Sequence, residues 1–317
     1  MQTYLACAAS LLLLGSPLPA QPEDSPPVPQ NLNIPMKTLG GRQFWSDVYW
    51  FHGWRIQRNV YTGHFRLLDD SDVRHAWGSY IQCRARLNDI RVEQKLPGLP
   101  KEVVVLVHGI FRSSKSMYRL REELAAAGMT VVAFDYPSTR VPVEDAADSL
   151  HAVLQSLEGV EKIHMVGFSL GGLVTRSCLE RHPDERIGRT VLVGTPNSGA
   201  EFAHVLRDFR WFKVTFGPAG QQLSHRLGVA RTLAPPPGEF AVIAGARNTP
   251  KGYNPLIPGD DDSTVSVNSA RLKGAVDSLI VPTIHSLLIN DRRTVAAVSC
   301  FLQTGRLRPE GDAEPVE

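Results

Sequence analysis

The pattern of apolar and polar positions along the chain changes near residue 98. Over residues 37–97, polar and aromatic side chains are interleaved, as in the stretches WRIQRN and HFRLL. This pattern is typical of antiparallel strands. Beyond residue 98, short apolar runs alternate with segments of helical spacing. Alternating strands and helices predict a mostly parallel sheet flanked by helices, with right-handed crossovers.

The second part of the chain is expected to form an α/β core at 98–305. A less regular stretch at about 200–238 predicts a small cap insertion, and 306–317 is expected to be a C-terminal tail. The expected strands lie at 102–109, 129–137, 162–168, 189–196 and 239–245, with a further apolar segment at 279–289. The expected helices lie at 116–128, 143–159, 170–182 and 291–302.

Residues 37–97 are rich in aromatic side chains and are expected to form an N-terminal extension with antiparallel strands. An aromatic stripe is more often core than ligand surface, so we expect a packed aromatic cluster here. Four of the five tryptophans lie in this segment: Trp45, Trp50, Trp54 and Trp77.

The apolar run from Leu5 to Gly15 is shorter than the roughly 18 residues that a transmembrane helix needs. It has the length of the apolar part of a signal peptide, so residues 1–20 are expected to direct export out of the cytoplasm. The Pro-rich residues 21–36 are expected to be a linker. Residues 1–4 carry no Lys or Arg, which a signal peptide normally has at its start. The alternatives are a misassigned start of the chain or a buried helix, and in either case the protein would be cytoplasmic.

Charge and composition exclude several classes of function. Lys and Arg number 34 against 32 Asp and Glu, whereas a nucleic-acid-binding protein should carry a dominant basic face. No CxxC or His-rich spacing suggests a metal site, and no cofactor is expected. The cysteines allow two alternatives: a disulfide between Cys83 and Cys300, or three buried thiols. Cys178 is expected to lie in a buried helix.

The sharpest chemical signal is the stretch GFSLGG at 167–172, between an expected strand and an expected helix. A serine in such a turn is held with its hydroxyl clear of the backbone. The helix that begins at Leu170 directs its free N–H groups toward the place where an oxyanion would form. Ser169 is therefore the candidate nucleophile.

A serine nucleophile needs a general base and an orienting acid, which follow it along the chain in this type of site. His285 lies just after an apolar strand and is the candidate base. The acid comes from the run Asp260, Asp261 and Asp262, of which Asp262 is favoured because of its offset from the apolar Val265. Asp261 is the next choice. The alternatives are a solvated turn, a weak calcium site, or Asp135 as the acid.

The oxyanion hole needs two backbone donors. Leu170 supplies one, and Ile110, in the loop after the first strand of the core, is placed to supply the other. His108 in the same loop is expected to be structural, because it precedes the nucleophile.

The motifs LVHGIF, GFSLGG, GTPNSGA, DDSTV and IHSLL together resemble the α/β-hydrolase superfamily, in particular its lipase-like and esterase-like branch. The resemblance covers roughly residues 100–305 and implies the α/β-hydrolase fold. Three positions depart from the pattern of that branch: Asn197 stands for a histidine, Ser263 for a glycine, and Phe168 for the histidine that many lipases carry before the serine.

The resemblance implies cleavage of carboxylic, lipid-like esters through an acyl-enzyme, without a cofactor. An acyltransferase of the same fold and a catalytically inert binding protein are the alternatives. In the cap, the aromatic side chains could belong to a lid, to a surface that touches lipid, or to packed helices. They are Phe209, Trp211, Phe212 and Phe216. The oligomeric state cannot be read from the sequence.

Overall fold

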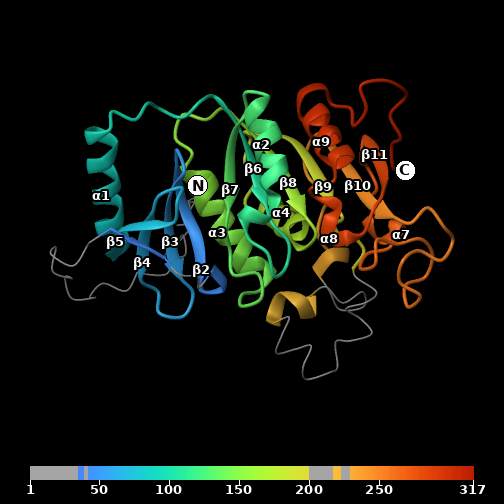
Figure 1. The fold of residues 1–317 in the computed structure, drawn as a ribbon, viewed down its shortest axis with the longest axis horizontal. Coiled ribbons are helices and arrows are strands. Elements are labelled where there is room, and N and C mark those ends of the chain that lie inside the picture. The colour runs from blue at the N-terminus through green and yellow to red at the C-terminus, as the bar shows by residue number, and fades with distance from the viewer. Residues whose placement is uncertain (1–34, 39–41, 200–216, 223–228) are drawn as a thin grey trace, which may run out of the picture.

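A parallel six-stranded sheet forms the centre of the C-terminal part of the chain (Figure 1). The computed structural model describes residues 35–38, 42–199, 217–222 and 229–317. The strands pair in the order β11-β10-β9-β8-β6-β7, which confirms the expected parallel sheet. They are β6 (Glu102–Val107), β7 (Thr130–Phe134), β8 (Lys162–Phe168), β9 (Ile187–Val193), β10 (Phe240–Ala246) and β11 (Asp277–Pro282).

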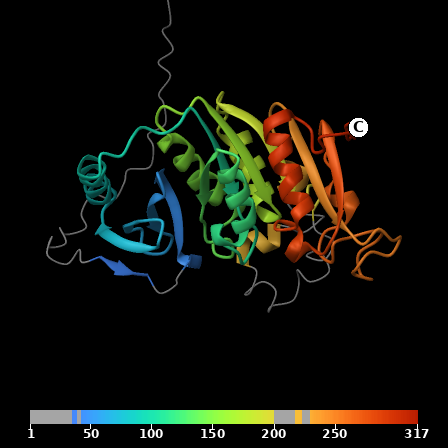
Figure 2. The ribbon, with the colours of Figure 1, turned by 45° about the horizontal axis from the view of Figure 1, so that its top comes forward.

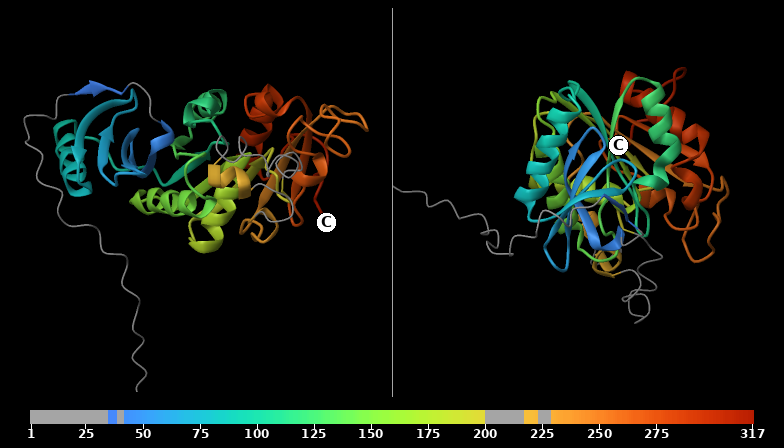
Figure 3. Two further views of the ribbon diagram at one scale, coloured as in Figure 1. Left: turned by 90° about the horizontal axis from the view of Figure 1, so that it is seen from below. Right: turned by 60° about the vertical axis from the view of Figure 1, so that its left-hand side comes forward.

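Helices cover both faces of this sheet because its strands are apolar on both sides. In β6, Val103, Val105 and Val107 pack in one core cluster with α3 and α4, while Val104 and Leu106 pack in another with α2 and α9. The left view of Figure 3 shows the two helix layers on opposite sides of the strands. The helices are α2 (Tyr118–Ala126), α3 (Val143–Ser156), α4 (Leu170–Arg181), α7 (Val267–Ala270), α8 (His285–Leu288) and α9 (Arg292–Thr304), with 3-10 turns η3 (Ser114–Met117) and η4 (Val229–Arg231).

The winding of the sheet reverses between β6 and β8, which are neighbours. The chain leaves β6 toward α2 on one face and leaves β8 toward α4 on the other face. The region beyond the carboxyl ends of these two strands is therefore the place where open α/β sheets bind their ligands.

A second, antiparallel sheet precedes the parallel one, as expected for the N-terminal extension (Figure 2). It lies between α1 and α3: Tyr49 and Phe51 pack with α1, whereas Trp50, between them in β2, packs in the cluster that includes α3. Its strands pair in the order β1-β5-β4-β3-β2. They are β1 (Met36–Lys37), β2 (Trp45–Phe51, after the 3-10 turn η2, Arg42–Phe44), β3 (Trp54–Asn59), β4 (Phe65–Leu68) and β5 (Val73–Gly78).

The sequence analysis missed helix α1 (Tyr80–Glu93), which packs on this sheet. Its buried face is only Cys83, Leu87 and Ile90, so the helical spacing of apolar residues is sparse. The available signal was a capping box: the Ser79 hydroxyl accepts from the backbone N–H of Gln82, whose side chain accepts from the Ser79 N–H.

The extension holds a packed aromatic cluster, as predicted, with Tyr49, Phe51 and Trp54 in its core, but its four tryptophans are divided among different sites. Trp50 packs in the core of the parallel sheet, and Trp54 packs in the core beneath α1. Trp45 and Trp77 are only partly buried, and both contact His64 edge-on, at ring-centroid distances of 5.0 and 6.3 Å. Successive side chains of a strand point to opposite faces, which separates residues that are close in sequence.

Cys83, Cys178 and Cys300 are free thiols. Cys178 is buried in α4, as expected. Cys83 belongs to α1 and Cys300 to α9, which lie at opposite ends of the molecule (Figure 1), so the two cannot form the alternative disulfide.

Several expectations fall outside the described residues. They are the signal peptide at 1–20, nearly all of the linker at 21–36, and the aromatic side chains at 209–216. In the described part of the cap, a helix at 217–222 packs on α3, where the Gln222 side chain accepts from the Val143 N–H at 2.8 Å. None of the helices in the described ranges is both long and apolar enough to cross a membrane.

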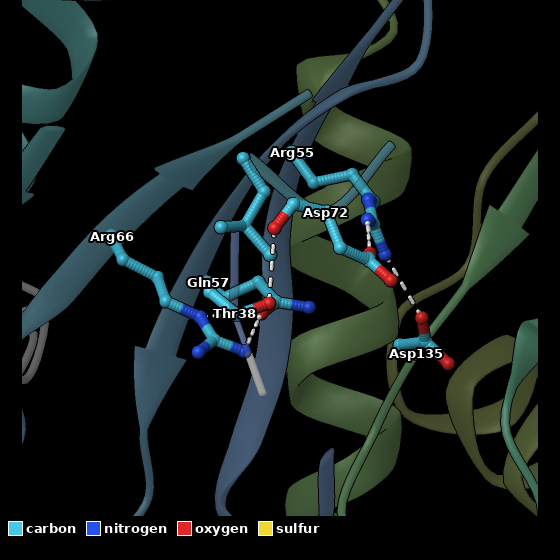
Figure 4. A pocket seen from close by; sticks show the side chains of 7 residues that line it. Thr38, Arg55, Gln57, Arg66, Asp72 and Asp135 are labelled. Atoms are coloured by element: carbon cyan, nitrogen blue, oxygen red, sulfur yellow. Dashed lines mark hydrogen bonds and ion pairs between the residues drawn. The ribbon is translucent and has the colours of Figure 1, made fainter. Parts of the chain in front are cut away.

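A buried charge network joins the two sheets (Figure 4). Arg55 of β3 donates to Asp135, at the end of β7, at 3.0 Å and to Asp72 at 2.5 Å, and Asp72 also binds Lys115. The carboxylate of Asp47 in β2 accepts from the Asp135 N–H at 2.7 Å. The network borders a cavity of about 100 Å³, whose lining includes Arg55, Asp72 and Asp135.

Arg55 is the cation that compensates Asp135 and Asp47, the two most buried carboxylates of this network. Burial raises the pKa of Asp47 to about 7, although the nearby charge of Arg55 acts in the opposite direction. The side chains of Arg55 and Asp135 are only 8% and 9% exposed, so water cannot replace the ion pair.

His108 is a second buried titratable group near the same junction, as the sequence analysis expected of a structural histidine. Its Nδ1 lies 2.8 Å from the Gly109 carbonyl oxygen, and its Nε2 accepts from the Tyr136 N–H at 3.4 Å. This arrangement fits the neutral ring with its proton on Nδ1. Burial lowers the pKa of His108.

We expect Arg55→Ala to lower the free energy of unfolding by roughly 3–5 kcal/mol, because it leaves buried carboxylates without a cation. Urea denaturation measures the loss. The matched control is Arg86→Ala, whose ion pair with Glu93 is exposed and should contribute less than about 1 kcal/mol. A loss for Arg55→Ala no larger than for Arg86→Ala would contradict the assignment.

We expect His108 to make stability depend on pH. Its folded-state pKa lies below the unfolded value near 6.5, so its contribution is present at pH 7 and is lost as the pH falls below about 6.5. The difference in unfolding free energy between wild type and His108→Gln should therefore shrink between pH 7 and pH 5, by at most ~1.4 kcal/mol per pH unit. A constant difference would show that the pKa of His108 is the same in the folded and unfolded states.

Candidate active site

Ser169 lies in a strained turn between β8 and α4, with φ 54° and ψ −123°. The left-handed φ is rare for a residue with a side chain. The turn is tight because a Cβ on Gly167 would lie 2.5 Å from the Gly172 Cα, and one on Gly171 would lie 2.2 Å from the Val107 carbonyl oxygen. The glycines of GFSLGG thus let strand, helix and the end of β6 meet around the serine.

Ser169, His285 and Asp262 form a continuous hydrogen-bonded chain. His285 Nε2 lies 2.9 Å from Ser169 Oγ, and His285 Nδ1 lies 2.6 Å from Asp262 Oδ2. The backbone supports this pairing, since the His285 N–H donates to the Asp262 carbonyl at 2.7 Å. Ser169 is 6% exposed and Asp262 is fully buried.

The second carboxylate oxygen of Asp262 is held by the backbone. Oδ1 accepts from the N–H groups of Thr264 and Val265 at 3.0 and 2.8 Å, which leaves Oδ2 for the imidazole. The apolar Val265, which set the expected offset, is therefore part of what orients the acid.

The other candidate acids lie elsewhere. Asp261 accepts from the N–H groups of Asn254 and Ser263, and Asp260 accepts from the Arg247 N–H. Asp135 belongs to the charge network between the sheets. Within the described ranges, no group of three or more His, Cys, Asp or Glu side chains is arranged to hold a metal ion.

Ile110 and Leu170 lie beside the serine, after β6 and at the start of α4. Across the described residues, neither backbone N–H has a backbone acceptor. The next amide, that of Phe111, is in use: it donates to Ser138 Oγ at 3.1 Å.

Asn197, which replaces a histidine of the lipase-like pattern, is a buried structural link. Its Oδ1 accepts from Arg176 at 3.1 Å, and its Nδ2 donates to the Ala270 carbonyl at 2.7 Å. Arg176 also donates to the backbone carbonyls of Leu233 and Ala234, where the chain returns from the cap. Arg176 was not among the expected site residues, although an arginine in the buried first part of the helix, well before Arg181, was a visible signal.

Comparisons with known proteins agree with this architecture. Residues 102–219 match the family model described as alpha/beta hydrolase fold. Salicylic acid-binding protein 2 of Nicotiana tabacum is 29% identical over 133 residues, which cover 37% of this chain and 51% of that protein. Methylesterase 3 of Arabidopsis thaliana is 30% identical over 93 residues, 26% of this chain and 35% of that protein. The chain thus spans about half, or less, of the length of these relatives.

Solved structures show the same fold. The mature form of a Bacillus licheniformis lipase matches with a TM-score of 0.53 and 21% identity, over 67% of this chain and 95% of that one. Its propeptide form matches with a TM-score of 0.54 and 20% identity, over 70% of this chain and 54% of that one. At this identity the likeness concerns the fold. From the family match, the order of the sheet and the likeness to these structures, we conclude that the chain has the α/β-hydrolase fold.

Proposed function

We propose that the protein hydrolyses carboxylic esters, with Ser169 as nucleophile, His285 as general base and Asp262 as orienting acid. The observation that carries the proposal is the bonding of the His285 ring, with Nε2 at 2.9 Å from Ser169 Oγ and Nδ1 at 2.6 Å from Asp262. The names of the relatives, which include a methylesterase and a lipase, support an ester as substrate.

The reaction proceeds in two steps. His285 Nε2 takes the proton of Ser169 while Oγ attacks the ester carbonyl, and the tetrahedral oxyanion is bound by the N–H groups of Ile110 and Leu170. The imidazolium then protonates the leaving alcohol, and the acyl group remains on Oγ. Water attacks this acyl-enzyme with His285 again as base, which releases the acid and restores the serine.

The strained backbone of Ser169 supports the same role. A residue held at positive φ costs about 1–3 kcal/mol, and such strain occurs mainly where it positions a reacting group. Here it directs Oγ toward the imidazole and away from the helix, since the serine side chain makes no capping bond to α4.

We expect a fluorophosphonate probe to label Ser169, because only an activated serine attacks this electrophile at an appreciable rate. Labelling should be lost in Ser169→Ala and in His285→Ala. The matched control is Ser149→Ala, on the exposed side of α3, which should be labelled like the wild type. Equal labelling of all these proteins would contradict the proposed nucleophile.

We expect Asp262→Asn to lower kcat on p-nitrophenyl esters by about 10³-fold or more, at least ~4 kcal/mol of transition-state stabilisation. An amide N–H at the Oδ2 position faces Nδ1 and favours the tautomer whose Nε2 cannot accept the serine proton. Asp260→Asn is the control: its Oδ1 still accepts from the Arg247 N–H, and kcat should stay within about tenfold of wild type. Full activity of Asp262→Asn would remove Asp262 from the site.

A further inference from the structure

Arg112 is a partly buried cation that touches the neighbours of both proposed reacting residues. Its Nη2 donates to the Ser286 carbonyl at 2.8 Å, directly after His285. Its guanidinium carbon lies 5.1 Å from the centre of the Phe168 ring, directly before Ser169. The same ring stacks on the imidazole of His285, at a centroid distance of 5.1 Å.

Arg112 and Arg119 donate to backbone carbonyls, whereas two other cations of the same segment bind carboxylates. Lys115 binds Asp72, and Arg121 binds Asp70 at 3.1 Å. In the ranges that the structure describes, Arg112 forms no ion pair, and its hydrogen bond goes to a neutral carbonyl. Its burial lowers its pKa, which reflects the cost of taking a cation out of water without a counter-ion. A ligand anion would remove that cost.

The free donors of Arg112 suit an anion. Only Nη2 is engaged, which leaves Nε and Nη1 without an acceptor among the described residues. A guanidinium with free N–H groups grips the oxygens of a carboxylate or a phosphate through charge-assisted hydrogen bonds.

Arg112 is not needed to hold the chain after His285 in place, because other hydrogen bonds already fix this stretch. Arg119 donates to the Asn290 carbonyl at 3.1 Å, and the Asn290 side chain donates to the Ser116 carbonyl at 2.7 Å. The surroundings of Arg112 also suit a substrate, since the adjoining Phe111 and Leu287 are 49% and 59% exposed. Among the described residues, the surface beside the proposed triad thus combines these apolar side chains with the cation of Arg112.

We propose that Arg112 binds an anionic group, a carboxylate or a phosphate, that the ester substrate carries near its scissile carbonyl. This inference rests on the proposed esterase function. It makes Arg112 a specificity-determining residue that selects amphiphilic anionic esters over neutral ones.

The kinetic test compares two esters of matched chain length, p-nitrophenyl butyrate and mono-p-nitrophenyl succinate. We expect the wild type to favour the succinate, and Arg112→Gln to lower the succinate-to-butyrate ratio of kcat/KM about ten- to hundredfold. Arg119→Gln is the matched control, because this arginine also donates to a carbonyl of the His285 segment, and it should leave the ratio unchanged. An equal loss on both esters would assign Arg112 a structural role, and an unchanged ratio would remove it from recognition; either result overturns the inference.

A binding test separates this inference from the proposed function and distinguishes the two kinds of anion. Succinate and inorganic phosphate are titrated calorimetrically into Ser169→Ala and into Ser169→Ala/Arg112→Gln. Binding of either anion that is lost in the double variant supports the site and identifies the preferred group, while binding of neither overturns it. Arg112-dependent binding in a protein that cleaves no ester would refute the esterase function and leave the anion site standing.

Discussion

The close approach of three backbone segments around Ser169 is the constraint on which the site depends. A Cβ on Gly171 would lie 2.2 Å from the Val107 carbonyl oxygen, so α4 begins in direct contact with the end of β6. This contact brings the loop that carries Ile110 and Arg112 next to the turn that carries Ser169. A larger residue at this position would separate the nucleophile from the amide of Ile110, even with every reacting side chain retained.

The reversal of the sheet between β6 and β8 explains why such contact arises there. The two strands are neighbours, yet their connections leave toward opposite faces, so the space beyond their ends is where open α/β sheets bind their ligands. His285 and Asp262 reach this space from β11 and from the segment after β10, on the same side of β8. The candidate acid and base therefore come from one flank of the sheet, and Ile110, the proposed oxyanion donor, comes from the other.

The sequence predicted those features that are encoded in short stretches of chain. Apolar runs gave the strands of the core, and GFSLGG gave the position of Ser169. The offset of Asp262 from Val265 reflected a real contact, since the Val265 N–H donates to that carboxylate. Helix α1 was missed because only three of its side chains are buried. The roles of Arg55 and Arg112 were beyond reach, because their partners Asp135 and Ser286 lie 80 and 174 residues away along the chain.

The buried pair of Arg55 and Asp135 ties the N-terminal extension to the parallel sheet. Asp135 lies at the end of a strand of the parallel sheet, but its cation belongs to the extension, and Trp50 of the extension fills part of the core under α3. A fragment cut at residue 98 would carry a buried carboxylate without its partner and an uncovered apolar surface on α3. The antiparallel sheet therefore shares buried charges and core packing with the parallel sheet, and the break in sequence pattern near residue 98 marks a change of architecture within one packed structure.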